Sequence, residues 1–273
     1  MKNRTIVITG AGGVLCSTFA KALAKSGAPI ALLDLNQQAA EAIAEEINQS
    51  GGTAKAYGAN VLNRESLEQV HQQILEDFGK CRILINGAGG NHPSATTKDE
   101  VFTPDADPND ISFFTLKQEG FSHVFDLNIW GTVLPCQIFA EDMIGSEGCS
   151  ILNISSMAAY SPLTKTPAYC AAKAGISNFT QWLAVHLAPQ GIRVNALAPG
   201  FFLTNQNRQL LVAENGEPTP RAGKILRNTP MGRFGTPEEL LGGLEFLLDD
   251  SKAGFVTGCI LPIDGGFSAY SGV

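Results

Sequence analysis

The 273-residue sequence lacks the closely spaced cysteines that bind zinc or build a disulfide scaffold. Its six cysteines stand at positions 16, 81, 136, 149, 170 and 259, with no C-x-x-C pair and no cluster of cysteine with histidine. Zinc sites and small disulfide-rich folds both need such spacings. We therefore expect reduced, mostly buried thiols and no metal site.

Basic residues are also scarce, and no long hydrophobic run is present. The 19 Lys and Arg residues against 26 Asp and Glu leave a net charge of −7, which offers no basic surface to nucleic acid or to an anionic membrane. Only Met1 and three polar residues precede the first apolar run, which leaves no room for a signal peptide, and no run reaches the length of a membrane span. We expect a cytoplasmic protein that binds neither nucleic acid nor a membrane.

Short apolar runs alternate with longer amphipathic runs along the chain. The short runs predict strands at residues 5–9, 29–33, 54–58, 83–86, 150–154, 193–198 and 259–262. The amphipathic runs predict helices at residues 15–26, 38–49, 65–78, 120–145 and 168–187. The alternation, with 44% hydrophobic residues, predicts an α/β protein in which residues 1–273 form a single domain. Its core is a doubly wound parallel sheet of about seven strands, with helices on both faces.

A glycine-rich turn follows the first predicted strand. Gly10, Gly12 and Gly13 would let the backbone turn tightly and approach a pyrophosphate at a helix N-terminus. Asp34 closes the second strand, where a carboxylate can accept hydrogen bonds from the adenosine ribose and repel a 2′-phosphate. No Lys or Arg adjoins it, so NAD(H) is favoured over NADP(H) as cofactor. The alternative is a solvated aspartate at a strand end.

Tyr169 and Lys173 stand at the start of a predicted helix. Thr166 can serve as its N-cap and Pro167 as its first residue, so the tyrosine lies in the first turn and the lysine one turn later on the same face. A free tyrosine has a pKa of about 10, which is too high for a base at neutral pH, and a nearby ammonium group lowers it. The pair suggests a proton-transfer catalyst, although a half-buried tyrosine near a surface lysine has the same spacing.

Other motifs accompany this pair in order along the chain. They are Thr9-Gly-Ala-Gly-Gly13, Asn86-Gly-Ala-Gly89, Asn128 within Phe125-Asp-Leu-Asn-Ile-Trp-Gly131, Ile151-Leu-Asn-Ile-Ser-Ser156 and Pro199-Gly200. With these motifs the chain resembles the short-chain dehydrogenase/reductase family over nearly its whole length. The resemblance implies a Rossmann-type fold and an NAD-dependent enzyme that acts on CH–OH groups. Members of the family commonly form homotetramers through two helices and the last strand, and we expect the same here, with the 120–145 helix contributing to both core and interface.

The resemblance also implies the catalytic roles. Tyr169 exchanges a proton with the substrate oxygen, Ser156 orients that oxygen, and Lys173 binds the nicotinamide ribose and lowers the pKa of the tyrosine. Asn128 holds a water in a proton relay through Lys173. Ser155 is the competing serine, but the thirteen-residue spacing to Tyr169 favours Ser156. These four residues speak against a dinucleotide-binding protein without catalysis.

The cofactor site carries one departure from the family pattern. The residues that the resemblance places at the cofactor are Gly10, Gly12, Gly13, Val14, Leu15, Asp34, Leu35, Asn60, Val61, Asn86, Gly87, Ala88, Tyr169, Lys173, Pro199, Gly200, Phe202 and Thr204. Val14 and Cys16 stand where the second and third motif glycines are usual. Because Val14 does not easily adopt a positive φ, we expect Gly12 or Gly13 to take over that role, whereas Cys16 is small enough for close packing.

Two long loops, 89–109 and 201–234, follow strand ends and are interpreted as lids or specificity elements rather than surface decoration. Their sequences and the C-terminal residues 262–273 resemble the short-chain type of D-mannonate oxidoreductase (fructuronate reductase), which interconverts D-mannonate and D-fructuronate with NAD(H). A gluconate 5-dehydrogenase-like or polyol enzyme is the alternative. An acyl-carrier reductase fits less well, because it would need a basic docking surface and usually NADPH. Whether the C-terminus reaches a neighbouring active site stays open.

A hexonate substrate needs a cation for its carboxylate and several amides or hydroxyls for its chain. The residues predicted to contact it are Asn91, His92, Ser156, Met157, Gln206, Asn207 and Arg208. Arg208 is the first choice for the carboxylate, followed by Arg233 and Lys165, although each could instead be solvated or ion-paired. His92 could instead cap a loop, and the histidines at 71, 123 and 186 are interpreted as structural.

Overall fold

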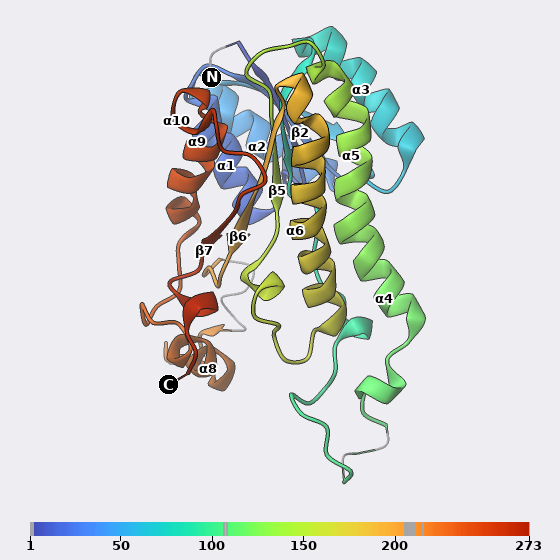
Figure 1. The fold of residues 1–273 in the computed structure, drawn as a ribbon, viewed down its shortest axis with the longest axis vertical. Helices are drawn as coiled ribbons and strands as arrows, with labels where there is room; N and C mark the ends of the chain where they lie inside the picture. The colour runs from blue at the N-terminus through green and yellow to red at the C-terminus, as the bar shows by residue number, and fades with distance from the viewer. Residues whose placement is uncertain (1–2, 106, 108, 205–210, 214–215, 273) are drawn as a thin grey trace.

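The computed structural model describes residues 3–105, 107, 109–204, 211–213 and 216–272. Within them, seven strands form one parallel sheet in the order β3-β2-β1-β4-β5-β6-β7 (Figure 1). The strands are β1 (Thr5–Thr9), β2 (Pro29–Asp34), β3 (Thr53–Gly58), β4 (Cys81–Asn86), β5 (Ser150–Ile154), β6 (Arg193–Pro199) and β7 (Ile260–Ile263). The predicted fold class is confirmed, and each predicted strand boundary lies within two residues of the observed one.

Helices cover both faces of the sheet (Figure 1). They are α1 (Val14–Ala24), α2 (Gln37–Gln49), α3 (Arg64–Phe78), α4 (Gln118–Phe125), α5 (Gly131–Phe139), α6 (Pro167–Leu187), α8 (Pro220–Arg227), α9 (Leu241–Leu248) and α10 (Asp250–Ala253). In the described part of the chain, no helix is both long enough and apolar enough to cross a membrane. The six cysteines are free thiols, five of them buried, as the sequence predicted.

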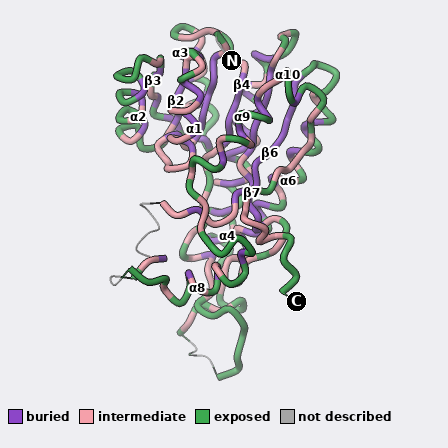
Figure 2. Tube along the Cα trace, turned by 90° about the vertical axis from the view of Figure 1, so that its left-hand side faces the viewer, coloured by how far each residue is buried: buried purple, intermediate pink, exposed green. Residues whose placement is uncertain are grey.

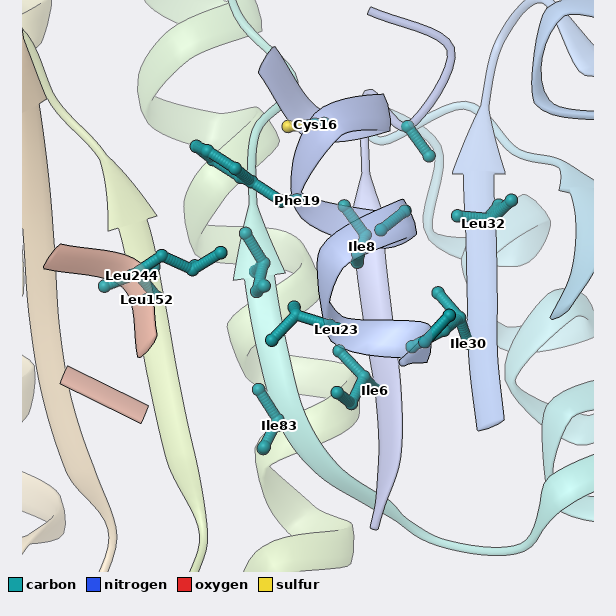
Figure 3. Close-up of a cluster of buried hydrophobic side chains, with 14 of the residues drawn as sticks. Ile6, Ile8, Cys16, Phe19, Leu23, Ile30, Leu32, Ile83, Leu152 and Leu244 are labelled. Carbon is teal, nitrogen blue, oxygen red and sulfur yellow. The ribbon is translucent and has the colours of Figure 1, made fainter. Parts of the chain in front are cut away.

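The core divides into two layers because successive strand side chains point to opposite faces. Ile6 and Ile8 of β1 pack with α1, α2 and α9 on one face, where Phe19 fills the space between helix and sheet (Figure 3). Val7, between them in sequence, packs with α3, α5 and α6 on the other face. All four side chains are fully buried, and each such burial contributes about 1.5–3 kcal/mol. The strands are therefore fixed by burial on both sides.

The single helix predicted for residues 120–145 is divided. It consists of α4, a π-helical turn at Asp126–Trp130, α5, and a 3-10 turn at Ala140–Met143. A π turn carries one extra residue, which opens the helix backbone. Asn128, fully buried in this turn, donates from its side-chain Nδ2 to the carbonyl of Val124 at 2.8 Å and so takes the place of a backbone donor. The helix widens where the sequence placed a catalytic residue.

The strand order reverses between β1 and β4, whose ends are paired through Thr9 and Asn86. In an open α/β sheet, ligands bind in the crevice outside the strand carboxyl ends at such a point. The segments 91–117 and 211–235, where described, and the C-terminus lie at this same end of the molecule (Figure 1). The fold thus brings the two predicted substrate loops to the edge that carries the glycine turn.

Candidate active site

The glycine turn after β1 presses against the loop after β4. Gly10 has φ +65°, and a Cβ there would lie 2.8 Å from the backbone nitrogen of Ala88. The hydroxyl of Thr9 accepts hydrogen bonds from the backbone N–H groups of Gly87 and Ala88, at 3.2 and 3.3 Å. A side chain at position 10 would therefore be excluded both by its conformation and by the neighbouring loop.

The path of this turn corrects one expectation. Among Gly10, Gly12 and Gly13, only Gly10 has a positive φ, so the expectation that Gly12 or Gly13 takes over that role is wrong. Gly13 is the N-cap of α1 at φ −73°, and Val14 is simply the first helical residue. Val14 needs no left-handed conformation, because the helix already begins at this residue, with Gly13 as its N-cap.

Cys16 packs as closely as predicted, and Gly87 makes this possible. A Cβ at Gly87 would lie 2.0 Å from the Cys16 Sγ atom and 2.9 Å from the Thr9 carbonyl oxygen, so a larger residue there would force Cys16 to shift. Burial raises the pKa of the Cys16 thiol to about 12, which makes it an inert packing group.

Asp34 closes β2 beside the glycine turn. Its Oδ2 accepts from the backbone N–H of Gly12 at 2.9 Å, and its Oδ1 accepts from the N–H of Asn36 at 2.8 Å. No Lys or Arg of the described residues forms an ion pair with it. The carboxylate is thus held in place at the crevice with exposed Leu35 next to it. This arrangement fits a ribose diol and disfavours a 2′-phosphate.

The N-terminus of α1 faces the same crevice. Gly13 offers no side chain to cap the helix, so the first N–H groups of Val14 and Leu15 have no side-chain acceptor from that position. Uncapped N–H groups together with the helix dipole make a site for a phosphate group. With Gly10 and Asp34, the residues present therefore fit a dinucleotide.

Other predicted cofactor residues are placed less uniformly. The Asn60 side chain is exposed, and its Oδ1 accepts from the N–H of Leu62 at 3.0 Å, while Val61 is buried. Asn86 is directed into the interior, where its Nδ2 donates to Asn153 at 2.9 Å. At this strand end, only the Asn86 backbone and the residues Gly87–Gly89 are in position to line the crevice.

The loop after β6 is closely packed at its start. A Cβ at Gly200 would lie 2.6 Å from the Asp264 Cα atom, which ties Pro199-Gly200 to the strand end of β7. The Phe202 ring belongs to the core cluster beneath α1 and α9, so a cofactor contact there would fall to its backbone. Thr204 is the last described residue before the gap at 205–210.

Tyr169 and Lys173 meet on one face of α6, as the spacing predicted. The Lys173 Nζ atom lies 5.6 Å from the centre of the tyrosine ring and donates to the carbonyl of Ile154 at 2.8 Å. Pro167 begins the helix and Thr166 is its N-cap residue, but the Thr166 side chain makes no capping bond. Its hydroxyl lies instead 3.6 Å from the Cys170 Sγ atom.

The pKa values of this pair differ from the expectation. Burial lowers the pKa of Lys173 to about 8. Burial also raises the pKa of Tyr169, and a hydrogen bond with Ser156 opposes that rise. In the protein alone, the predicted lowering of the tyrosine pKa by Lys173 is therefore absent, because removing the phenolate from water outweighs the hydrogen bond with Ser156.

The two serines after β5 have separate contacts. Ser155 is buried, lies 2.7 Å from the Ser177 hydroxyl and donates to the carbonyl of Lys173 at 3.1 Å, so its contacts are structural, as expected. The Ser156 hydroxyl accepts from the N–H of Ala158 at 3.1 Å and is hydrogen-bonded with Tyr169. Ser156 is the serine that shares a site with the tyrosine.

Asn128 clamps the loop after β4. Its Nδ2 donates to the carbonyl of Gly90 at 2.7 Å, and its Oδ1 accepts from the Gly90 N–H at 3.2 Å. A Cβ at Gly89 would lie 2.7 Å from the Asn128 Oδ1 atom and 3.3 Å from the Lys173 Nζ atom. The asparagine and the lysine thus converge on Gly89, and a larger residue there would separate them.

A cavity of about 850 Å³ opens beside these residues. Its wall comes from segments 91–100 and 162–166, Phe201, α8 and Phe267. Asn91 and His92 line it as predicted, whereas Gln206, Asn207 and Arg208 lie outside the described residues. Met157 is buried beneath the cluster that contains Tyr169.

Two side chains that the sequence suggested for substrate binding form hydrogen bonds within the protein. His92 caps the short helix Pro93–Ala95, since its Nδ1 accepts from the N–H of Ser94 at 3.3 Å. Arg233 forms two hydrogen bonds with Glu239, at 2.6 and 2.7 Å. This guanidinium is therefore paired with Glu239, and Arg233 is not among the residues that line the cavity.

Sequence reasoning missed several residues of the site. Thr9 was a detectable candidate, because a hydroxyl at a strand end next to glycine is suited to bind a neighbouring loop. Phe201, Arg221 and Phe267 line the cavity, yet they come from separate parts of the chain. Nothing local in their surroundings predicts that they meet.

The sheet order, the glycine turn and the Tyr169–Lys173 pair together are typical of one protein family. The family of short chain dehydrogenases matches residues 4–215, and the chain belongs to this family of oxidoreductases. It is 60% identical over 273 residues to an uncharacterised oxidoreductase of Haemophilus influenzae, covering 100% of this chain and 96% of that protein. It is 50% identical to the uncharacterised oxidoreductase UxuB of Bacillus subtilis, and the match covers 100% of this chain and 98% of that protein. A crystal structure of a candidate D-mannonate oxidoreductase from Haemophilus influenza, with NAD bound, superposes on this chain with a TM-score of 0.97. The two chains are 60% identical, and the match covers 100% of this chain and 98% of that chain.

Proposed function

We propose that this chain is an NAD(H)-dependent dehydrogenase that interconverts a secondary alcohol and a ketone of a sugar acid, with D-mannonate and D-fructuronate as the pair. The observation that carries the proposal is the position of Tyr169 and Ser156. They lie between a crevice suited to a dinucleotide and a cavity whose wall bears excess positive charge. The Haemophilus structure at 60% identity, which holds NAD and is described as a candidate D-mannonate oxidoreductase, supports the cofactor and the substrate class.

The cofactor part of the proposal rests on Gly10, the open N-terminus of α1 and Asp34. Together they supply a close backbone approach, phosphate-binding N–H groups and a ribose acceptor. When bound, NAD(H) accepts or supplies the hydride. Asp34 has no cationic partner among the described residues, so a 2′-phosphate would meet uncompensated negative charge.

Tyr169 handles the proton in this proposal. Its raised pKa keeps the phenol protonated near neutral pH, so the hydroxyl can donate to the oxygen of a ketone during reduction. Ser156, hydrogen-bonded with the tyrosine, orients the same oxygen. Lys173, with a pKa of about 8, stays mostly charged at neutral pH and stabilises negative charge that develops on the tyrosine oxygen. Asn128 positions Gly89 and Gly90 against this lysine.

The proposal also retains one domain over residues 1–273, a cytoplasmic location and a homotetramer. An apolar outer face supports the tetramer: Trp130 on the π turn is partly exposed, as is Trp182 on α6, which stacks on His186. Large exposed apolar side chains on neighbouring helices are typical of a subunit interface. Sedimentation of the purified protein tests this part of the proposal.

The proposed reaction is tested by following NADH consumption with D-fructuronate, 5-ketogluconate, tagaturonate and fructose, each repeated with NADPH. We expect strong selectivity for D-fructuronate and NADH. Reduction of 5-ketogluconate in preference would assign the chain to the gluconate 5-dehydrogenase-like alternative, and reduction of fructose alone would point to a polyol enzyme. Efficient use of NADPH would contradict the role given to Asp34.

A further inference from the structure

The cavity wall carries more positive than negative charge. Lys165, Arg221 and Lys224 line it, and Glu100 is the acidic residue among them. Lys224 is bound to both carboxylate oxygens of Glu100, at 2.8 and 2.9 Å. Lys165 and Arg221 form no ion pair with a carboxylate of the residues described here. The hydrogen bond from Lys224 lowers the pKa of the Glu100 carboxyl, and the Lys165 charge also lowers it, although Lys165 and Glu100 form no ion pair. Lys165 and Arg221 are therefore both available to an anion that enters the cavity.

Lys165 has an unusual backbone conformation. Its φ of +72° lies in the left-handed region, where Asn3 is the other non-glycine residue of the described chain. The N–H of Thr97 donates to the Lys165 carbonyl at 2.9 Å, which fixes the backbone against the loop after β4. Glycine would adopt this conformation with less strain. Lys165 is half-buried and lines the cavity, and strained residues of this kind cluster at ligand sites.

The cavity adjoins the catalytic tyrosine. Leu163, Phe201 and Phe267 line the cavity and also pack in one apolar cluster with Tyr169. Lys165 precedes Tyr169 by four residues, across the start of α6. A substrate that places its reacting carbon at the Tyr169 hydroxyl would therefore extend along this apolar wall toward the cationic part of the cavity.

We propose that Lys165 binds the carboxylate of the substrate, with Arg221 as a second donor, and thereby selects sugar acids over neutral sugars. This inference rests on the proposed function and names the residue that sets its substrate class. A ketose with a CH₂OH group in place of the carboxylate would leave both cations unpaired. Arg208, our first choice from sequence, lies outside the described residues, and the inference rests on Lys165 and Arg221 alone.

The test compares D-fructuronate with D-fructose, which differs from it by this one group. Lys165→Met should raise KM for D-fructuronate by about tenfold or more, because a charge-assisted hydrogen bond is lost. Its KM for D-fructose and its affinity for NADH should not change. Lys165→Arg should stay near the wild-type KM. Lys165→Gly should raise KM as much as Lys165→Met while relieving the backbone, so its melting temperature should not fall.

Arg227→Gln is the matched control, because Arg227 is a cation of the same helix as Arg221 but does not line the cavity. It should leave KM for D-fructuronate unchanged. An equal rise in KM for Arg227→Gln and Lys165→Met would show a general field effect and overturn the inference. An unchanged KM in Lys165→Met would overturn the inference but not the proposed function. A wild-type protein that reduces no keto acid would overturn both.

Discussion

The two ends of the molecule are stabilised in different ways. The sheet end holds the seven strands, and the proposed substrate end holds the described residues of the segments 91–117 and 211–235. In the sheet, residues such as Val7 and Leu33 have no exposed surface, and Figure 2 shows burial concentrated in the strands. In the segment 91–117, Phe113 and Phe114 are 68% and 73% exposed, and the Phe114 ring packs edge-on against Phe113 and Phe102. The first region is held by a shared core, and the second by local contacts. The difference separates the part that stabilises the protein from the part that we propose selects its substrate.

Ion pairs show the same division. Lys98–Asp110 and Lys224–Glu100 join exposed parts of the substrate end at 2.6 and 2.8 Å, and exposed pairs of this kind add little to stability. In the sheet end, Arg193 is largely buried, binds Asp250 at 2.8 Å and donates to the carbonyl of Leu247 at 2.8 Å. Substitutions at the two ends should accordingly have separable effects.

The largest effect is expected at the boundary between the two ends. Tyr169→Phe removes the proton donor and should lower kcat by about 10²–10⁴-fold, the usual contribution of general acid–base catalysis. Because the hydroxyl packs against neither core layer, the melting temperature and the NADH dissociation constant should be retained. Kinetics and NADH fluorescence titration measure both. Turnover that survives in Tyr169→Phe would contradict the assigned role and favour a binding protein.

Lys173 should make the free energy of unfolding depend on pH. Its pKa is lowered from 10.5 to about 8 by burial, so between these values the unfolded chain holds a proton that the folded chain has lost. Stability therefore rises with pH through this window, and the cost of the buried charge is fully present below it. Relative to Lys173→Met, the wild type should gain about 3 kcal/mol between roughly pH 7 and 11.

Urea unfolding of both proteins across that range measures the difference, and the Met variant cancels the contributions of all other titrating groups. A pH-independent difference between the two proteins would show that Lys173 has an ordinary pKa in the folded state.

Gly87 tests the packing between the two cofactor loops. Gly87→Ala places a Cβ 2.0 Å from the Cys16 Sγ atom and should lower the free energy of unfolding by about 1–3 kcal/mol, as overpacking does. Adding Cys16→Ala should restore part of this loss. Gly90→Ala is the control, because a Cβ there meets nothing within 4 Å. Equal losses at positions 87 and 90 would contradict the packing argument.

The smallest effect is expected for Arg233 at the substrate end. Its guanidinium is engaged by Glu239, so Arg233→Gln should leave KM for the acid substrate unchanged, in contrast to the lysine in the cavity wall. Glu239→Gln is the companion variant, since it frees the arginine without removing it. A rise in KM for Arg233→Gln alone would return Arg233 to the candidates for carboxylate binding.

The sequence by itself determined the sheet and the proximity of Tyr169 and Lys173. Strands that are buried on both faces must be apolar throughout, so runs such as those around Val7 and Leu33 could be recognised from composition and length. Tyr169 and Lys173 are one helical turn apart, and a helix fixes that geometry locally. The position of Asp34 beside the glycine turn could likewise be predicted, because Asp34 is the last residue of its strand.

Only the tertiary structure decided the features that depend on neighbours distant in sequence. Asn128 of the π turn binds the backbone of Gly90, and the fit of Cys16 needs Gly87. The raised pKa of Tyr169 follows from its burial, which no spacing reveals. The ion pair of Arg233 and the cavity beside Lys165 arise in the same way, since loop side chains are placed by specific contacts rather than by a repeating pattern of burial.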